Sequence, residues 1–232
     1  MRIHSSNPVY HSINNTIASD RPVTYTNVAI KTVFLVLITL GTGCYFIANP
    51  NLVSIPLLIG AVIVGFIAVI IGTRSVRFAP YLSVLYAACE GLILGIVSVA
   101  YETLYEGIVP TALITTVVVL LVMMLLYSMN IIKVNVRFAS FMVVALITVI
   151  MMSVLGMILP FGGGTLYIII SILSALLSAF YLFLDFENIK ACVIGQVDVS
   201  YSWVLALGMM VSLVWIYVEI LRLLAFFGNH RN

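Results

Sequence analysis

The chain has 232 residues, of which 63% are hydrophobic and only 8% are charged. Soluble domains are about 45–50% apolar and about 25% charged, so this composition excludes an ordinary soluble protein. The formal net charge is +2 and the chain has no basic run, which argues against a nucleic-acid partner. We therefore expect a lipid bilayer to surround most of the chain.

Residues 1–27 are polar and rich in Ser, Asn and Thr. They contain no apolar run, so they do not resemble a cleavable signal peptide. We interpret them as an N-terminal tail. Residues 28–227 are predicted to form the transmembrane domain, and 228–232 a short C-terminal tail.

Long continuous apolar runs follow the tail, and a spanning helix needs about 20 such residues. In hydrocarbon only helices and closed barrels satisfy their backbone groups, and continuous rather than alternating runs favour helices. The sequence therefore predicts an all-α polytopic membrane protein with seven transmembrane helices. The predicted segments are 28–48, 52–73, 80–100, 108–128, 138–159, 165–185 and 202–227.

The basic residues predict the orientation of these helices. Eight of the ten fall on one side of a seven-span arrangement: Arg2, Arg21, Lys31, Arg74, Arg77, Lys133, Arg137 and Lys190. The opposite joints contain Glu102 and Glu106 but no Lys or Arg. Basic residues favour the cytoplasmic side of a membrane. We therefore expect the protein in the cell (inner) membrane, with its N-terminus in the cytoplasm and its C-terminus outside. The alternative has six spans, with the last segment re-entrant or peripheral.

Ionisable residues inside predicted spans are candidate functional sites, because their burial is costly without partners. Glu90 lies near the middle of its segment, beside small residues spaced four apart that favour close helix packing. The small residues are Ser83, Ala87, Gly91 and Gly95. Glu90 is expected to face the bundle interior, and the alternative role is a structural hydrogen bond to a neighbouring Ser or Tyr.

Asp185 ends a polar stripe on the sixth predicted helix. Ser174, Ser178, Tyr181 and Asp185 follow one another at spacings of four, three and four residues, which places them on one helix face. The functional interpretation is a water-lined path that ends at a carboxylate. The alternative is an aspartate solvated at the helix end, and the next acids, Glu187 and Asp198, are interpreted as solvated loop residues.

Glu219 and Arg222 lie three residues apart on the last predicted helix and are neighbours on its surface. Ser212 shares the face of Glu219. The pair contributes to an ion pathway in one interpretation. In the other it is a structural ion pair, or Arg222 extends to the outer interface.

No enzyme is expected from the sequence. All three histidines (His4, His11 and His230) lie in the tails, and zinc-protease, phosphate-loop and dinucleotide-binding motifs are absent. Three cysteines without close spacing indicate neither a zinc site nor a disulfide framework. No resident cofactor is expected, although Ca²⁺ is a possible transported ion.

Five stretches resemble the Bax inhibitor 1 family, in particular its bacterial branch of Bax-inhibitor-like membrane proteins. They occur in the same order along nearly the whole chain: HSSNPVY (4–10), APYLSVLYAACEGLILGIVS (79–98), YETLYEGIV (101–109), FLDF (183–186) and LVWIYVEILRLL (213–224). The resemblance implies six helices around a central C-terminal helix and a proton-sensitive calcium leak. It also implies an aspartate on each of the last two helices, and the two share a proton.

Asp185 matches the first of these aspartates, whereas Ser212 occupies the position of the second. Our leading hypothesis is a pH-sensitive Ca²⁺ leak channel or exchanger, in which Asp185 contacts Ca²⁺ because this ion prefers oxygen ligands. Its expected pathway residues are Asp185, Glu219, Glu90, Ser212, Arg222, Ser178 and Tyr181. The alternatives are a non-transporting regulator that binds membrane proteins, such as a quality-control protease, and a small-solute carrier.

Overall fold

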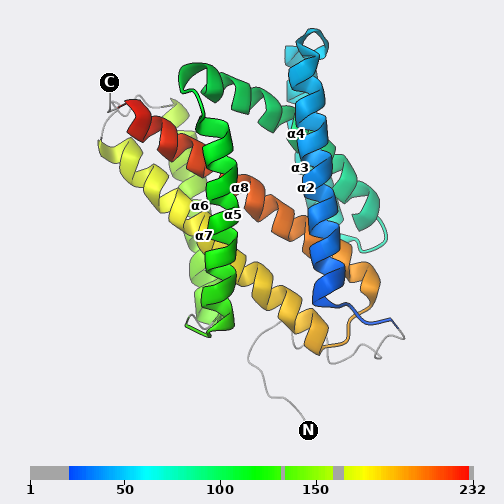
Figure 1. The fold of residues 1–232 in the computed structure, drawn as a ribbon. Helices are drawn as coiled ribbons and strands as arrows, with labels where there is room; N and C mark the ends of the chain where they lie inside the picture. Colours follow the sequence, from blue (N-terminus) through cyan, green and yellow to red (C-terminus); the bar gives the residue numbers. More distant parts are fainter. Residues whose placement is uncertain (1–20, 132–133, 159–164, 230–232) are drawn as a thin grey trace.

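The computed structural model describes residues 21–131, 134–158 and 165–229, which form a bundle of long helices (Figure 1). The elements are α2 (Tyr25–Ala48), η1 (Pro50–Leu52), α3 (Ile55–Arg74), α4 (Ala79–Leu104), α5 (Ile108–Ser128), α6 (Val136–Ile158), α7 (Thr165–Ile194), η2 (Val199–Tyr201) and α8 (Ser202–Asn229). The predicted all-α polytopic fold is confirmed.

Local chemistry explains where several helices begin. The Thr24 side chain caps α2 by accepting a hydrogen bond from the Asn27 backbone N–H. Pro56 and Pro80 lie in the first turns of α3 and α4, where a backbone N–H has no helical partner to lose. Gly107 adopts a positive φ of 80° between α4 and α5, a conformation that glycine tolerates without strain.

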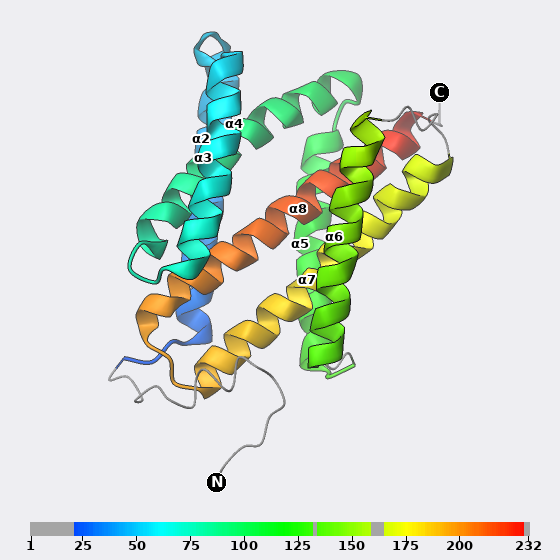
Figure 2. The same ribbon diagram turned by 180° about the vertical axis from the view of Figure 1, so that it is seen from behind.

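The C-terminal helix α8 is the centre of the bundle. It passes between a group formed by α2, α3 and α4 and a group formed by α5, α6 and α7 (Figures 1 and 2). Residues of α8 contact α2, α3, α4, α5 and α7, and α6 packs against α7. In the most apolar stretch of α8, 61% of the residues are buried, whereas 17–39% are buried in the corresponding stretches of the other long apolar helices. The alternative that places this last segment at the periphery is therefore wrong.

In the part of the chain that the structure describes, six helices are long and apolar enough to cross a bilayer: α2, α3, α4, α5, α7 and α8. In α6 the apolar stretch within the described residues, Val136–Met152, is shorter. Large apolar side chains cover the outer surface, among them Phe66, Ile114 and Phe141. A lipid bilayer is the environment in which such a surface is stable.

Glycines allow α2 and α4 to approach closely. A Cβ atom added at Gly91 would lie 1.8 Å from Thr42 Oγ1 and 2.4 Å from the Thr39 carbonyl oxygen. Gly95 similarly faces the Gly43 backbone. The predicted small-residue ladder on α4 is thus the surface that packs against α2, as expected for small residues in membrane helix contacts.

The helix that carries Asp185 is longer than the apolar run that predicted it. The expected segment was 165–185, whereas α7 continues to Ile194. After Asp185 the helix becomes amphipathic, and Ile189 and Cys192 are buried in the core. Asp185 therefore lies two turns before the helix end, and the interpretation as a helix-end aspartate is wrong.

Candidate functional site

The polar stripe on α7 faces the central helix α8. The two helices are consecutive in the chain and run antiparallel (Figure 2). At one end of the stripe Asp185 contacts Ser212, and at the other end Ser174 contacts Glu219. One interface therefore contains two carboxylates and their hydroxyl partners, a polar seam inside an apolar bundle.

Asp185 and Ser212 form the first contact of this seam. The Ser212 hydroxyl donates a hydrogen bond of 2.5 Å to Asp185 Oδ2. One turn earlier on α8, Gly208 leaves space beside the other carboxylate oxygen, where an added Cβ would lie 3.6 Å from Oδ1. Among the residues that the structure describes, Asp185 forms no ion pair. Its negative charge is therefore available to a mobile cation or a proton.

Glu219 is the centre of the second contact. It is only 3% exposed. Its Oε1 accepts hydrogen bonds from Ser174 Oγ (2.6 Å) and Trp215 Nε1 (3.2 Å). Arg222 forms an ion pair with its Oε2 at 2.9 Å. Buried charge is tolerated when it is paired and hydrogen-bonded, and this carboxylate has three donors.

The two remaining stripe residues have other partners. The Ser178 hydroxyl donates to the Ala175 carbonyl of its own helix, at 2.8 Å. The Tyr181 hydroxyl donates to the Met142 carbonyl on α6, at 3.3 Å. The Tyr181 ring also packs against Trp215, with 5.5 Å between the ring centroids. Tyr181 therefore connects α6, α7 and α8 near the middle of the seam.

A comparison with protein families agrees with this architecture. The family model described as Bax inhibitor 1 like matches residues 6–229. The chain belongs to the Bax inhibitor 1 family. No curated protein matches it. The resemblance inferred from five sequence stretches is thereby confirmed over nearly the whole chain, and it covers every helix of the bundle.

In this Bax inhibitor 1 family member Glu90 lies away from the seam. It is partly buried on α4, where the Tyr86 hydroxyl of the preceding turn is its hydrogen-bond partner. Within the described residues no hydrogen bond or ion pair joins Glu90 to Asp185 or Glu219. The geometry resembles the structural hydrogen bond that the sequence left open as an alternative.

Sequence reasoning missed two polar contacts between helices. Ser98 on α4 and Tyr217 on α8 are joined by a hydrogen bond of 2.7 Å. Tyr127 on α5 donates to Glu187 on α7 at 2.7 Å, so Glu187 is not the solvated loop residue that was expected. The sequence signal for such a contact is a polar residue within an otherwise apolar helix. This signal does not identify the helix that supplies the partner.

The described residues contain no group of three or more His, Cys, Asp or Glu side chains that could hold a metal ion. Ca²⁺ takes about six to eight oxygen ligands. Asp185 and Ser212 together offer three side-chain oxygens. A Ca²⁺ ion beside them would keep several water ligands, which suits an ion in transit.

Proposed function

We propose that this protein is a pH-sensitive cation leak pathway, for Ca²⁺ and H⁺, and that Asp185 is its titrating group. The observation that carries the proposal is the contact between Asp185 and Ser212. A carboxylate without an ion-pair partner lies between α7 and the central helix, where lipid cannot solvate it. Such a group is stable when it binds a proton or a cation.

The proposed pH response follows from competition at this carboxylate. The ionised form attracts a hydrated cation into the seam. The protonated form has no charge and still accepts the Ser212 hydrogen bond, so the α7–α8 contact closes without a cation. The leak is therefore largest at high pH and falls as pH decreases. In the described residues, Ser212 donates a hydrogen bond to Asp185 and Tyr181 interacts with it electrostatically, and neither side chain changes charge around neutral pH.

Glu219 has a different role in this proposal. Its charge is neutralised by Arg222, and Ser174 and Trp215 occupy Oε1. A cation that passes Asp185 meets this neutral cluster next, roughly 10 Å further along α8, given a rise of 1.5 Å per residue. The pair contributes structure and a barrier, whereas Asp185 contributes the pH dependence.

The proposed orientation places the beginning of α2 and the α7–α8 connection in the cytoplasm. These parts lie at the same end of the bundle (Figure 1). Basic residues gather at that end, including Arg21, Arg74, Arg77 and Lys190. The positive charge favours the cytoplasmic side of the cell membrane.

The direct experiment is Ca²⁺ flux from liposomes that contain the purified protein, measured over a pH series. Flux that rises with pH supports the proposal. Liposomes that show no protein-dependent flux at any pH contradict it and favour the second candidate below.

The second candidate is a membrane regulator that binds other membrane proteins without transport. A specific feature favours it: an apolar groove of about 710 Å³ between α2, α4, α5 and α8. Its lining includes Gly43, Gly95, Val117 and Val214. An apolar segment of a partner protein would fit such a surface. Copurification of a specific membrane protein, lost when Val117 is replaced by Trp, would test this candidate.

A further inference from the structure

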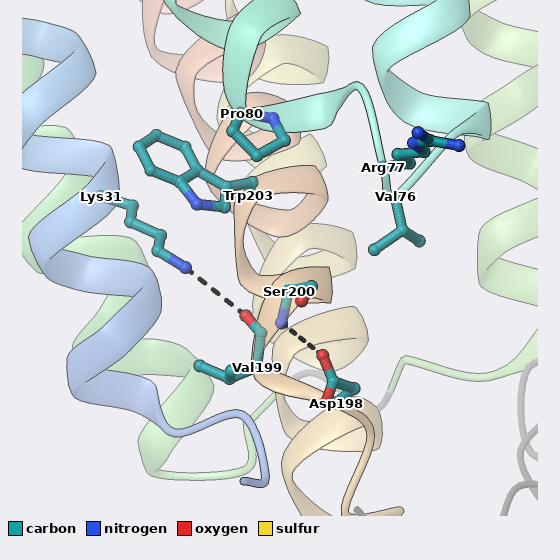
Figure 3. Close-up of a pocket in the computed structure, with 8 residues that line it drawn as sticks. All are labelled: Lys31, Val76, Arg77, Pro80, Asp198, Val199, Ser200 and Trp203. Carbon is teal, nitrogen blue, oxygen red and sulfur yellow. Dashed lines mark hydrogen bonds between the residues drawn. The ribbon is translucent and has the colours of Figure 1, made fainter.

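A pocket of about 520 Å³ that has charged residues in its lining lies at the end of the bundle where α8 begins (Figure 3). It is formed by α2, the α3–α4 connection and the α7–α8 connection, and it is separate from the Asp185 seam. Its lining includes Lys31, Arg77, Pro80, Asp198, Ser200 and Trp203. Two cations from different parts of the chain thus contribute to the lining of one cavity.

Contacts with η2 and α8 hold the Lys31 ammonium in place. It donates to the Val199 carbonyl at 3.4 Å and to the Ser202 hydroxyl. It also lies 4.9 Å from the centroid of the Trp203 ring (Figure 3), a cation–π contact. These partners fix the position of the ammonium, and Asp198 is the acid that attracts it electrostatically.

Arg77 supplies the second cation. Its side chain is exposed and its guanidinium contacts the Phe78 ring at 5.9 Å. In the part of the chain that the structure describes, neither Arg77 nor Lys31 forms an ion pair. A guanidinium presents two parallel N–H donors, which match two oxygens of a phosphate.

Asp198 limits the charge that the pocket can accept. One of its oxygens caps η2 by accepting the Ser200 N–H at 2.9 Å (Figure 3). The charged lining residues are Lys31, Arg77 and Asp198, so one positive charge is in excess. A ligand group with one negative charge balances the pocket, whereas a phosphate monoester with nearly two would be repelled by Asp198.

The pocket also lies at the position along the bundle where a lipid headgroup is expected. Lys31 lies six residues after the start of α2, which is roughly 9 Å along the helix axis. Trp203 is in the first turn of α8. Tryptophan is enriched at the boundary between headgroups and hydrocarbon, and basic pockets between membrane helices on the cytoplasmic side bind anionic headgroups.

We propose that this pocket binds the phosphodiester headgroup of an anionic phospholipid of the adjacent leaflet. Arg77 contacts the phosphate as a fork, Lys31 supplies a fixed second charge, and the Trp203 ring packs beside the upper part of the acyl chains. The lipid thereby connects α2, the α3–α4 connection and α8. This proposal is independent of cation transport.

The test uses the purified full chain in a neutral detergent and measures its thermal unfolding midpoint as phosphatidylglycerol is added. A ligand that binds the folded state raises the midpoint, and the concentration dependence gives an apparent affinity. Arg77→Gln is the test variant. Arg74→Gln is its matched control, because Arg74 is also exposed and close in sequence but does not line the pocket.

We expect the parent and Arg74→Gln to respond alike and Arg77→Gln to need about tenfold more phosphatidylglycerol. Lys31→Gln, compared with its own lipid-free midpoint, should lose affinity as well. Equal affinities of Arg77→Gln and Arg74→Gln would overturn the site. An equal response to phosphatidylcholine would overturn the requirement for an anionic headgroup, and saturation by free glycerol phosphate would overturn a lipid as the ligand.

Discussion

Ser212 on the central helix donates a hydrogen bond of 2.5 Å to Asp185 on α7. The resemblance to the Bax inhibitor 1 family implies an aspartate where Ser212 stands, so this family member has one acid and one hydroxyl where two acids were implied. A single carboxylate binds one proton independently. Its response to pH is therefore expected to be gradual, with the steepness of a titration that involves one proton.

Rebuilding the pair should change this response. In Ser212→Asp two carboxylates would lie in contact and would share a proton, because like charges at this distance cannot both ionise easily. The midpoint of the flux response is expected to move to higher pH. This midpoint is measured as Ca²⁺ flux from liposomes over a pH series. Glu219→Gln and Glu90→Gln are controls, and a midpoint moved by either control but not by Ser212→Asp would assign the gate to another acid.

Breaking the Glu219–Arg222 pair should lower stability. Arg222→Gln removes the cationic partner of a carboxylate that is 3% exposed, and Ser174 and Trp215 remain as donors. A loss of about 1–3 kcal/mol in unfolding free energy is expected. The double variant Glu219→Gln/Arg222→Gln should recover most of this loss, since no unpaired charge remains. Thermal unfolding in detergent measures both, and a double variant no better than the single one would argue against charge burial as the cause.

Alanine substitutions at two glycines, one inside the α2–α4 contact and one outside it, should differ in their effect on stability. Gly91→Ala places a Cβ against Thr42 and the Thr39 backbone, whereas at Gly41 nothing lies within 4 Å of an added Cβ. We expect Gly91→Ala to cost roughly 1–3 kcal/mol, as overpacked sites do. Gly41→Ala is expected to leave stability unchanged or slightly higher, because alanine favours helix. Similar unfolding midpoints for the two variants would show that α2 and α4 are not held at this distance.

The proposed orientation predicts opposite labelling at the two ends of α5. In a background without native cysteines, Leu104→Cys precedes α5 and Ile131→Cys follows it, and both positions are exposed. A membrane-impermeant thiol reagent added to intact cells should label position 104 and not position 131. Labelling of both positions from outside would contradict the proposed crossing of α5.

Hydropathy predicted the helices well because a bilayer imposes a length and a composition on each span. It placed the end of α7 at Asp185, although the helix continues to Ile194. After Asp185 the helix is amphipathic and is stabilised by one buried face, which Ile189 and Cys192 supply. A hydropathy threshold does not detect such a continuation.

The site was predictable only in part. The Glu219–Arg222 contact follows from helix geometry alone, since residues three apart are neighbours. The proximity of Ser212 to Asp185 followed from the family resemblance, because it depends on how two helices are aligned. The pocket between Lys31 and Arg77 was not predicted, because these residues lie on separate elements and no sequence pattern relates them.

The most direct test of the account is the Ca²⁺ flux of the parent and Asp185→Asn, measured side by side in liposomes over a pH series. Asparagine has a similar shape and can still accept the Ser212 hydrogen bond, so the α7–α8 contact is retained. We expect the flux of the parent to rise with pH, and Asp185→Asn to show low flux that is independent of pH. An Asp185→Asn profile that follows the parent over the whole series would contradict it.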